Sequence, residues 1–406
     1  MVAVPHRVLP RAGPQPVSVA VVDDSVVVRG LLSKWLSETN GVEVVGTYRS
    51  GREIINALPG VMPKIILLDL DMPEMDGITA LPLILAKSPH SRVIVVSSLS
   101  VHGAELTMRS LMRGATDYLP KPSNHREVST SADFRQALVA KVLAVGGVRL
   151  AARVPVQPAS VPAPVSPLAR PRPPQPAALP ERPAIPTPFV RPAVSAPAAP
   201  GQIRLRPIER GRPKLVVIGA STGGPQALVA LLARMRPALG RVPVVIAQHM
   251  PPIFGSIFAT HLKQHAGLPA VEAADGAVLM PGAIYLAPGG CHTVVRKKPD
   301  GQIVIAMLPS EARGPWRPSI DLLFSSAAET FGGEALAIAL TGMGRDGTEG
   351  AQHLARRAAN VIVQDEASSV VWGIPGSIAE AGLANALLPP EKLGELAVTL
   401  LEGQTP

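Results

Sequence analysis

The stretch LVVIGASTGGPQALVALLARM at residues 215–235 decides the fold of the C-terminal half of this 406-residue chain. A short apolar run is followed by a glycine-rich turn and then by an amphipathic segment, a pattern that predicts a buried parallel strand, a tight turn and a helix. Pro225 falls in the first helical turn, where its missing N–H is not needed. We therefore expect an α/β fold built on a parallel sheet.

The turn itself carries a candidate nucleophile. Gly219, Ser221 and Gly223 fit the G-x-S-x-G pattern, which holds a serine hydroxyl up at the edge of a sheet. Free N–H groups at the start of the following helix can stabilise a developing oxyanion. A helix start of this kind also attracts phosphate, but the glycines are not spaced G-x-G-x-x-G and no Lys-Ser/Thr follows. The pattern favours a serine hydrolase over a phosphate-binding loop.

Two further apolar runs end at residues that could activate this serine. VVIAQH ends at His249, and ALAIALTGMGRD ends at Asp346 in a glycine-rich turn. The carboxyl ends of parallel strands collect functional groups at one edge of a sheet. A serine needs a base to take its proton, and the base needs a partner that fixes its tautomer. We predict Ser221 as nucleophile, His249 as base and Asp346 as the acid that orients His249.

Other residues of this half could fill the same roles. His292, which follows Pro-Gly-Gly-Cys, is a second candidate base. Asp321, at an expected helix start, and Asp365, at a strand end, are alternative acids. Cys291 is the alternative nucleophile, although a reactive thiol requires a poised base and a depressed pKa. The remaining histidines fall on expected helices with polar neighbours: His261, His265 and His353.

The N-terminal part alternates β-branched runs with amphipathic stretches. Five such runs predict a doubly wound parallel sheet with helices between its strands. The expected strands are residues 17–22, 42–48, 64–70, 93–98 and 115–120.

Polar residues follow the strands of this first sheet. Asp23, Asp24, Asp69, Ser97 and Lys121 lie at strand ends that should share one edge. Each acid alone could cap a turn or a helix. Together they repel one another unless a cation is present, and carboxylate oxygens suit Mg²⁺. The set predicts that Asp69 accepts a phosphoryl group, with the metal and Lys121 neutralising its oxygens.

The motifs VVDDS, LLDLDMPEMDG, VVSS and GATDYLPKP resemble, in order and spacing, the receiver domain of two-component response regulators over roughly residues 18–140. The resemblance implies a flavodoxin-like fold, Asp69 as phosphoacceptor, and a histidine kinase of the CheA type as phosphodonor. It also implies a Mg²⁺ site and a set of switch residues. The metal ligands would be Asp23, Asp24, Asp69 and the backbone carbonyl of Asp71, and the switch residues would be Ser97, Tyr118 and Lys121.

The chain order Ser, His, Asp differs from that of α/β-hydrolases, where the acid precedes the histidine. GASTGGP, AQHMP, APGG, RPSIDLLF, LTGMGRDG and VQDEASSVVWGIPGS instead resemble the catalytic domain of the CheB family of chemotaxis methylesterases, over residues 214–401. The resemblance implies a Rossmann-like α/β domain that needs no cofactor, with the triad as assigned. Thr222, Gly223 and Met343 would support the oxyanion. One departure is Gly255 after Phe254, where the family commonly has threonine, and we expect little effect.

By this resemblance the chain would hydrolyse glutamate γ-methyl esters on methyl-accepting chemotaxis receptors, releasing methanol, and would deamidate receptor glutamines. The receiver would switch this activity by phosphorylation. Two alternatives stay open from the sequence. One is a phosphorylation-controlled esterase or amidase of a receptor array outside motility, and the other is a signalling adaptor without catalysis.

Between the two sheets lies a stretch rich in Pro, Ala and Arg that accounts for many of the 45 prolines. This composition favours extended polyproline II and a semi-rigid spacer. We expect a disordered segment at residues 1–16, a receiver at 17–145, a linker at 146–210 and a catalytic domain at 211–403.

The formal net charge of +9 sits largely on and beside this linker. A basic linker could touch nucleic acid or lipid, but it also keeps a spacer solvated, and few aromatics argue against a nucleic-acid platform. The single cysteine excludes an internal disulfide and fits a reducing compartment. Prolines interrupt the N-terminus before a signal peptide could form, and no run reaches about 18 apolar residues. We expect a monomeric cytoplasmic protein without membrane insertion.

Overall fold

The structure is a computed structural model that describes residues 15–122, 131–147, 203–309 and 316–404. Most of the segment predicted to be disordered and most of the predicted linker lie outside these residues. Within the described ranges, no helix has the length and apolar character that a bilayer crossing requires.

The N-terminal sheet has five parallel strands in the order β2-β1-β3-β4-β5, which confirms the predicted doubly wound fold. The chain starts at β1, adds β2 at the edge on one side and then continues with β3, β4 and β5 on the other. The strands are β1 (Val17–Val22), β2 (Val42–Tyr48), β3 (Ile65–Asp69), β4 (Arg92–Ser98) and β5 (Asp117–Lys121).

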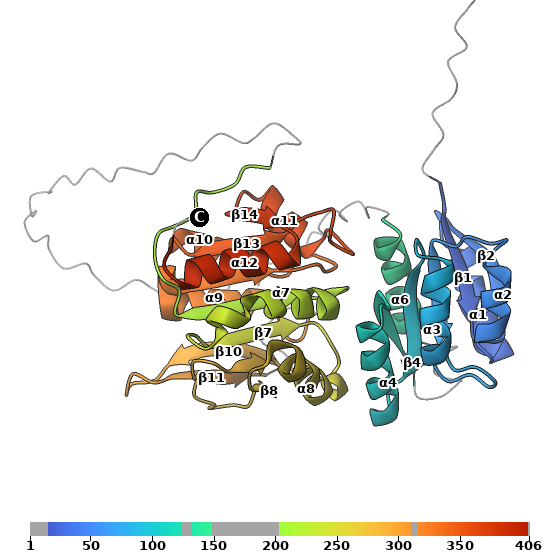
Figure 1. The fold of residues 1–406 in the computed structure, drawn as a ribbon, viewed down its shortest axis with the longest axis horizontal. Helices are drawn as coiled ribbons and strands as arrows, with labels where there is room; N and C mark the ends of the chain where they lie inside the picture. The colour runs from blue at the N-terminus through green and yellow to red at the C-terminus, as the bar shows by residue number, and fades with distance from the viewer. Residues whose placement is uncertain (1–14, 123–130, 148–202, 310–315, 405–406) are drawn as a thin grey trace, which may run out of the picture. The chain divides into compact units, whose positions relative to one another are not determined.

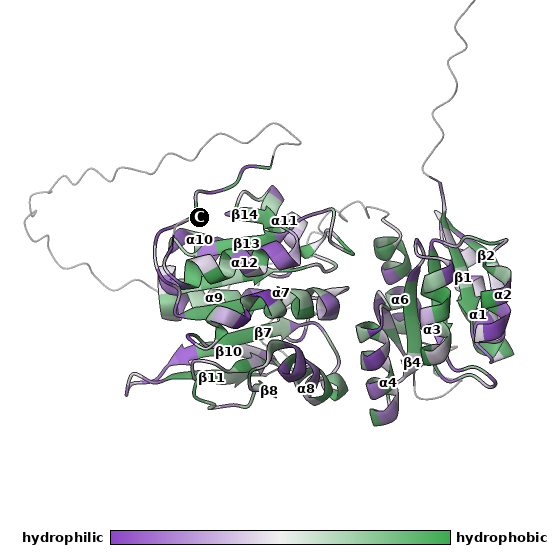
Figure 2. Ribbon diagram, in the orientation of Figure 1, coloured by the Kyte–Doolittle hydropathy of each residue, from purple (hydrophilic) through white to green (hydrophobic). Residues whose placement is uncertain are grey.

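Alternate residues of each strand enter the two helix layers on either side of this sheet. Val19 and Val21 of β1 pack with α1 (Val26–Ser37) and α6 (Ala132–Val145). Ala20 and Val22 belong to the core on the other face, which is covered by α2 (Gly51–Ala57), α3 (Gly77–Lys87) and α4 (Val101–Met112). The apolar character of the strands is visible in Figure 2. Burial on both faces explains why the strands read as continuous apolar runs.

The C-terminal sheet has seven parallel strands in the order β14-β13-β12-β6-β7-β9-β8. Strand β6 is central, with β7 on one side and β12 on the other, so the strand order reverses at β6. Such a switch point opens a crevice at the carboxyl ends of the strands. The strands are β6 (Leu215–Ala220), β7 (Val244–Gln248), β8 (Ala270–Glu272), β9 (Ile284–Leu286), β12 (Ala335–Ala339), β13 (Asn360–Gln364) and β14 (Ala386–Leu388).

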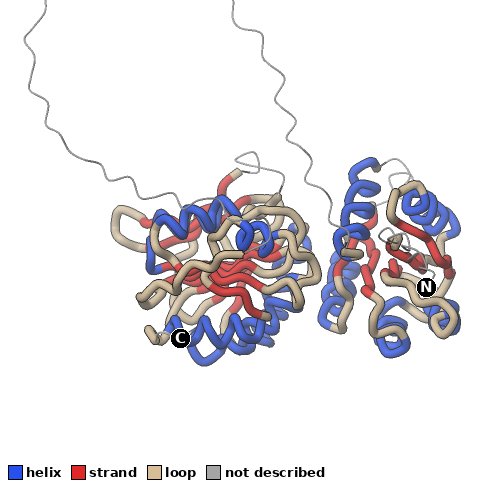
Figure 3. Tube along the Cα trace, turned by 90° about the horizontal axis from the view of Figure 1, so that it is seen from above, coloured by secondary structure: helices blue, strands red, loops and turns tan. Residues whose placement is uncertain are grey.

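Two helix layers enclose this sheet, as Figures 1 and 3 show. One face carries α7 (Gly224–Leu239), α8 (Gly255–Ala266) and α12 (Pro390–Leu401). The other face carries α9 (Ile320–Phe331), α10 (Thr348–Arg356) and α11 (Ile374–Glu380). A separate antiparallel hairpin, β10 (His292–Lys297) with β11 (Ile303–Leu308), packs against α9.

Part of the predicted linker is fixed to this sheet. Arg206 donates from its guanidinium to the carbonyl oxygens of Ala355 and Ala359, at 3.3 and 3.1 Å, and its backbone N–H donates to Ala384. Glu209 exchanges two hydrogen bonds with the side chain of Asn360. Residues 203–210 therefore belong to the surface of the C-terminal sheet layer.

Candidate active site and phosphoacceptor site

Ser221 stands directly after the central strand β6, at the switch point. The next residues turn sharply into α7, with Gly223 in the left-handed region at φ 76° and the Gly224 N–H donating to the Ser221 carbonyl at 2.8 Å. A Cβ on Gly223 would lie 2.5 Å from Val370, so this position requires glycine for two reasons. The predicted strand, turn and helix are confirmed.

Gly342, in the loop after β12, lies against the serine. A Cβ at this position would come within 2.7 Å of the Ser221 Cβ and 3.1 Å of its nitrogen. The Ser221 N–H donates to the carbonyl of the neighbouring Thr341 at 3.0 Å. The loop thus presses on the serine backbone and leaves no room for a side chain beside it.

Gln248, the last residue of β7, joins the serine and histidine strands. Its side chain is buried, and its Nε2 donates to the carbonyl oxygens of Ser221 at 2.9 Å and His249 at 3.2 Å. The His249 N–H donates in turn to Ala220 at 3.0 Å. Gln248 was not predicted from the sequence; a single amide at the end of an otherwise apolar run was the available signal.

His249 and Asp346, predicted from separate strand ends, meet in the structure. The His249 Nε2 lies 2.8 Å from the Asp346 Oδ2. Because a carboxylate only accepts, Nε2 carries the hydrogen and Nδ1 keeps its lone pair. Nδ1 is buried and has no hydrogen-bond partner among the residues that the structure describes. A ring held in this tautomer has one nitrogen available to take a proton.

The Asp346 carboxylate is bound by the N-terminus of α9. It accepts hydrogen bonds from the backbone N–H groups of Ile320 at 2.7 Å and Asp321 at 3.0 Å, and from the hydroxyl of the N-cap Ser319 at 3.1 Å. Burial alone would raise the pKa of Asp346, but the bond and charge of His249, with these N–H groups, lower it below its usual value. The positive end of the helix keeps this acid ionised.

Asp321, an alternative candidate for the acid, is not the residue that is hydrogen-bonded to His249. It lies in the first turn of α9, as expected, and its side chain accepts from the Gly350 N–H of α10 at 2.8 Å. The two helices thus exchange acids: α9 binds Asp346 from the loop before α10, while α10 binds Asp321 from α9. Burial, together with the neighbouring Asp346, raises the pKa of Asp321 to about 6.

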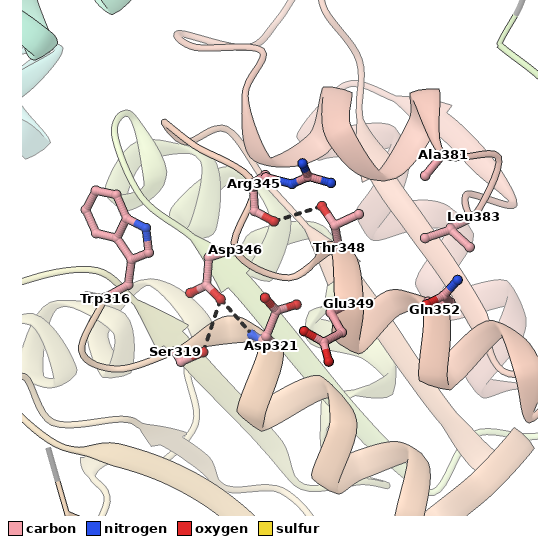
Figure 4. A pocket seen from close by; sticks show the side chains of 10 residues that line it. All are labelled: Trp316, Ser319, Asp321, Arg345, Asp346, Thr348, Glu349, Gln352, Ala381 and Leu383. Atoms are coloured by element: carbon pink, nitrogen blue, oxygen red, sulfur yellow. Dashed lines mark hydrogen bonds between the residues drawn. The ribbon is translucent and has the colours of Figure 1, made fainter. Parts of the chain in front are cut away.

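A pocket of about 580 Å³ opens beside these carboxylates, with Trp316 at one end and Ala381 and Leu383 at the other (Figure 4). Seven of the ten residues that line it carry polar or charged side chains. The remaining lining residues are Ser319, Asp321, Arg345, Asp346, Thr348, Glu349 and Gln352.

The other candidates lie elsewhere. His292 begins β10, outside the main sheet, and neither ring nitrogen has a hydrogen-bond partner in the described ranges. Asp365 follows β13 and accepts from the N–H of Ser368 at 2.9 Å. Burial, and next the charge of Glu272, raise the pKa of the Cys291 thiol, which makes it a poor nucleophile. His261, His265 and His353 lie on helices, as predicted.

The predicted supporting residues flank the serine. The Thr222 carbonyl accepts from the Thr341 hydroxyl at 2.9 Å, which ties the elbow to the loop after β12. Met343 belongs to the same loop, one residue beyond Gly342. Gly342 also accepts from the N–H groups of Gly373 and Ile374, at 3.1 and 2.9 Å, so this loop is fixed on both sides.

In the N-terminal sheet, Asp23 and Asp69 meet Lys121 at the carboxyl ends of the strands. The Lys121 Nζ lies 2.9 Å from the Asp23 Oδ2 and 2.7 Å from the Asp69 Oδ2. Burial raises the pKa of Asp69 to about 6, with a further contribution from Asp23, while Lys121 opposes the rise. Burial alone would lower the pKa of Lys121, but the two carboxylates raise it.

Three carboxylates at this edge have the chemistry of a divalent cation site. Oxygen atoms of Asp23, Asp24 and Asp69 lie within 4.8 Å of one another. Such a hard-oxygen set suits Mg²⁺. The Asp71 N–H donates to the Asp69 Oδ1 at 3.3 Å, which keeps the loop of Asp71 beside the cluster.

The remaining switch candidates lie on the neighbouring strands β4 and β5. The Ser97 hydroxyl near the end of β4 is hydrogen-bonded to the Thr107 hydroxyl of α4. Tyr118 lies on β5, three residues before Lys121.

Comparisons with known proteins agree with these two sites. A family model described as CheB methylesterase matches residues 216–397, and one described as response regulator receiver domain matches residues 19–133. The chain is 44% identical over 397 residues to the protein-glutamate methylesterase/protein-glutamine glutaminase of group 2 operon of Bradyrhizobium diazoefficiens, covering 96% of this chain and 95% of that protein. A protein-glutamate methylesterase/protein-glutamine glutaminase of Rhodopseudomonas palustris is 41% identical over 394 residues, with the same coverage. The chain belongs to the CheB methylesterase family and carries a response-regulator receiver domain in its N-terminal half.

Proposed function

We propose that this chain is a phosphorylation-controlled protein-glutamate methylesterase and protein-glutamine glutaminase acting on chemotaxis receptors. The observation that carries the proposal is the 2.8 Å contact between His249 Nε2 and Asp346 Oδ2, which leaves Nδ1 free at the strand edge where Ser221 stands. The names of the relatives supply the substrate class, a glutamate γ-methyl ester or a glutamine amide in a protein.

In the first stage His249 takes the proton of Ser221 through Nδ1, and the serine oxygen attacks the ester carbonyl. Backbone N–H groups at the start of α7, with Thr222, Gly223 and the loop of Met343 around them, stabilise the developing oxyanion. The imidazolium then protonates the leaving group, which departs as methanol from an ester or as ammonia from an amide.

In the second stage water attacks the acyl-serine. His249 takes the proton of the water and returns it to the Ser221 oxygen, which releases free glutamate. Asp346 keeps Nε2 protonated throughout and stabilises the positive charge of the ring in each transition state. The anchoring of Asp346 on α9 supports this role because the carboxylate does not have to be reoriented between the stages.

The receiver would control this reaction through a phosphoryl group on Asp69 supplied by a CheA-type histidine kinase. Asp23, Asp24, Asp69 and the Asp71 carbonyl would hold Mg²⁺, which neutralises charge on the transferred group. Lys121 lies within ion-pair distance of Asp69 and would contact the phosphoryl oxygens. Ser97 would exchange its bond to Thr107 for one to the phosphoryl group.

Methanol release from methylated receptors of the same cell tests this proposal. Ser221→Ala should lower turnover by roughly three orders of magnitude or more while leaving the unfolding temperature nearly unchanged. Ser256→Ala, on the exposed side of α8, is the matched control and should keep full activity. Full methanol release by the Ser221 variant would refute the assignment, and no release by the wild type on any receptor would favour a binding role instead.

A further inference from the structure

Trp316 stacks on the imidazole that we assign as the base. The two ring centroids are 5.0 Å apart, and the ring planes differ by only 2°. The His249 side chain is 7% exposed, whereas Trp316 is 36% exposed. The indole therefore covers the histidine from the solvent side while it remains partly accessible itself.

Gly344 is a second neighbour of the indole. A Cβ on Gly344 would lie 3.7 Å from the Cζ2 of Trp316, an ordinary van der Waals distance. Gly344 belongs to the loop that leads to Asp346, and Trp316 leads through Arg317 and Pro318 to Ser319, which hydrogen-bonds Asp346. Trp316 thus lies between the base and two segments that hold the acid.

We propose that Trp316 is a positioning residue for His249, and that it favours the imidazolium form in the transition state. His249 has one strong polar contact, at Nε2, about which the ring could still tilt. A parallel indole face restricts that tilt and so holds Nδ1 at the strand edge where Ser221 stands. When the ring takes the serine proton it becomes a cation, and a cation over an indole face is stabilised by the ring quadrupole.

This role rests on the proposed function, because it assigns His249 as the base. It makes a different prediction from a role in substrate binding. An interaction that strengthens as the ring gains charge lowers kcat when it is removed, whereas a substrate contact made equally in both states raises KM alone. A purely structural tryptophan would change the unfolding temperature and neither constant.

The steady-state test compares Trp316→Leu with Trp316→Phe in the full-length protein on methylated receptors. Leucine removes the aromatic face, and kcat should fall roughly 3- to 30-fold with KM within twofold of wild type. Phenylalanine keeps a face and should restore most of kcat. Trp35→Phe, in α1 of the other sheet, controls for the loss of an indole. An unchanged kcat, or a raised KM with kcat intact, overturns the proposal.

A fluorescence test needs no substrate and therefore separates this inference from the proposed function. Protonated imidazole quenches a stacked indole, so the emission of Trp316, taken as wild type minus Trp316→Phe, should fall on acidification. The fall should vanish in His249→Asn, while Ser221→Ala should keep it. Quenching that persists without His249 would show that the rings do not stack. Quenching together with absent esterase activity would leave the stack standing and refute the proposed function.

Discussion

At the scale of single residues, the site depends on glycines that leave space as well as on the side chains proposed to react. Gly342 faces Ser221, and a Cβ on it would clash with both Ile374 and the serine. Asp69 shows the converse: the carboxylate that we propose as phosphoacceptor is buried beside Asp23, where its ionised form lowers the stability of the fold. One added carbon atom at Gly342, or one proton on Asp69, is therefore enough to change the site.

Gly342→Ala should reduce methanol release at least tenfold, because the new methyl group at 2.7 Å must displace the Ser221 backbone. Gly240→Ala is the matched control: a Cβ there meets nothing within 4 Å, and its backbone is helical at φ −61°. The control should keep wild-type kcat and be equally or slightly more stable. Equal activity of the two variants would contradict the tight contact.

Asp69→Asn should stabilise the receiver at pH 7 by roughly 1–3 kcal/mol. The pKa of Asp69 is raised to about 6 in the folded protein, so the folded state binds the proton more tightly than the unfolded chain. Stability therefore falls as pH rises from about 4 to 6, and the penalty is complete above that window. Urea unfolding at pH 4 and pH 7 measures it. The two proteins should converge at pH 4, and Mg²⁺ should narrow the gap at pH 7.

At the scale of elements, the decisive arrangement is the exchange of acids between α9 and α10. Each helix N-terminus binds a carboxylate that belongs to the other element, at 2.7–3.0 Å for Asp346 and 2.8 Å for Asp321. Neither carboxylate forms an ion pair with a lysine or arginine among the described residues. The negative charge of Asp346 is stabilised instead by backbone N–H groups and by His249.

Asp321→Ala should be about 1 kcal/mol less stable than Asp321→Asn at pH 7, because both variants lose the charge but only alanine also loses the cap on the Gly350 N–H, and it should lower kcat because the first turn of α10, next to the loop of Asp346, loses its tie to α9. Asp321→Asn is the conservative partner. It keeps an oxygen for the Gly350 N–H and removes the charge that Asp346 opposes, so it should be at least as stable as wild type at pH 7. Urea unfolding and methanol release decide the point. If asparagine were as destabilising as alanine, the capping role would be wrong.

Local patterns in the sequence were sufficient to predict β6, the elbow and α7, because an apolar run, a glycine turn and an amphipathic segment are all contiguous. They also brought His249 and Asp346 to one edge, since both follow strands of a parallel sheet. The hydrogen bonds from the N-terminus of α9 to Asp346 could not be predicted, because they depend on how α9 packs beside α10. Trp316 was missed for the same reason: its partner is 67 residues away in the sequence, and it lies in no periodic run.

At the scale of the whole molecule, the chain joins a hydrolytic centre to a site that accepts a transient charge. A phosphoryl group on Asp69 can change turnover at Ser221 only as far as it distinguishes two states of the protein. Lys121 can make the two states differ. In the unphosphorylated receiver its ammonium group binds Asp23 and Asp69, and a phosphoryl group on Asp69 would compete with these carboxylates for it.

Acetyl phosphate with Mg²⁺ should raise methanol release by the wild-type protein and leave Asp69→Asn at its basal rate. Chelation of Mg²⁺ should abolish the stimulation without affecting the basal rate, since the steps proposed at Ser221 use only side chains and backbone N–H groups. Receptor methylation measured with and without the phosphodonor provides the assay. Stimulation of the Asn variant, or no stimulation of the wild type, would contradict control through Asp69.

The exchanged acids also determine how this part of the molecule comes apart. A helix end ordinarily frays on its own, at little cost. Here the first turn of α9 cannot loosen without releasing Asp346, and that of α10 cannot loosen without releasing Asp321. Because Asp321 itself lies in the first turn of α9, loosening that turn releases both carboxylates, so we expect the two helix ends to open as one cooperative unit and to take Asp346 with them.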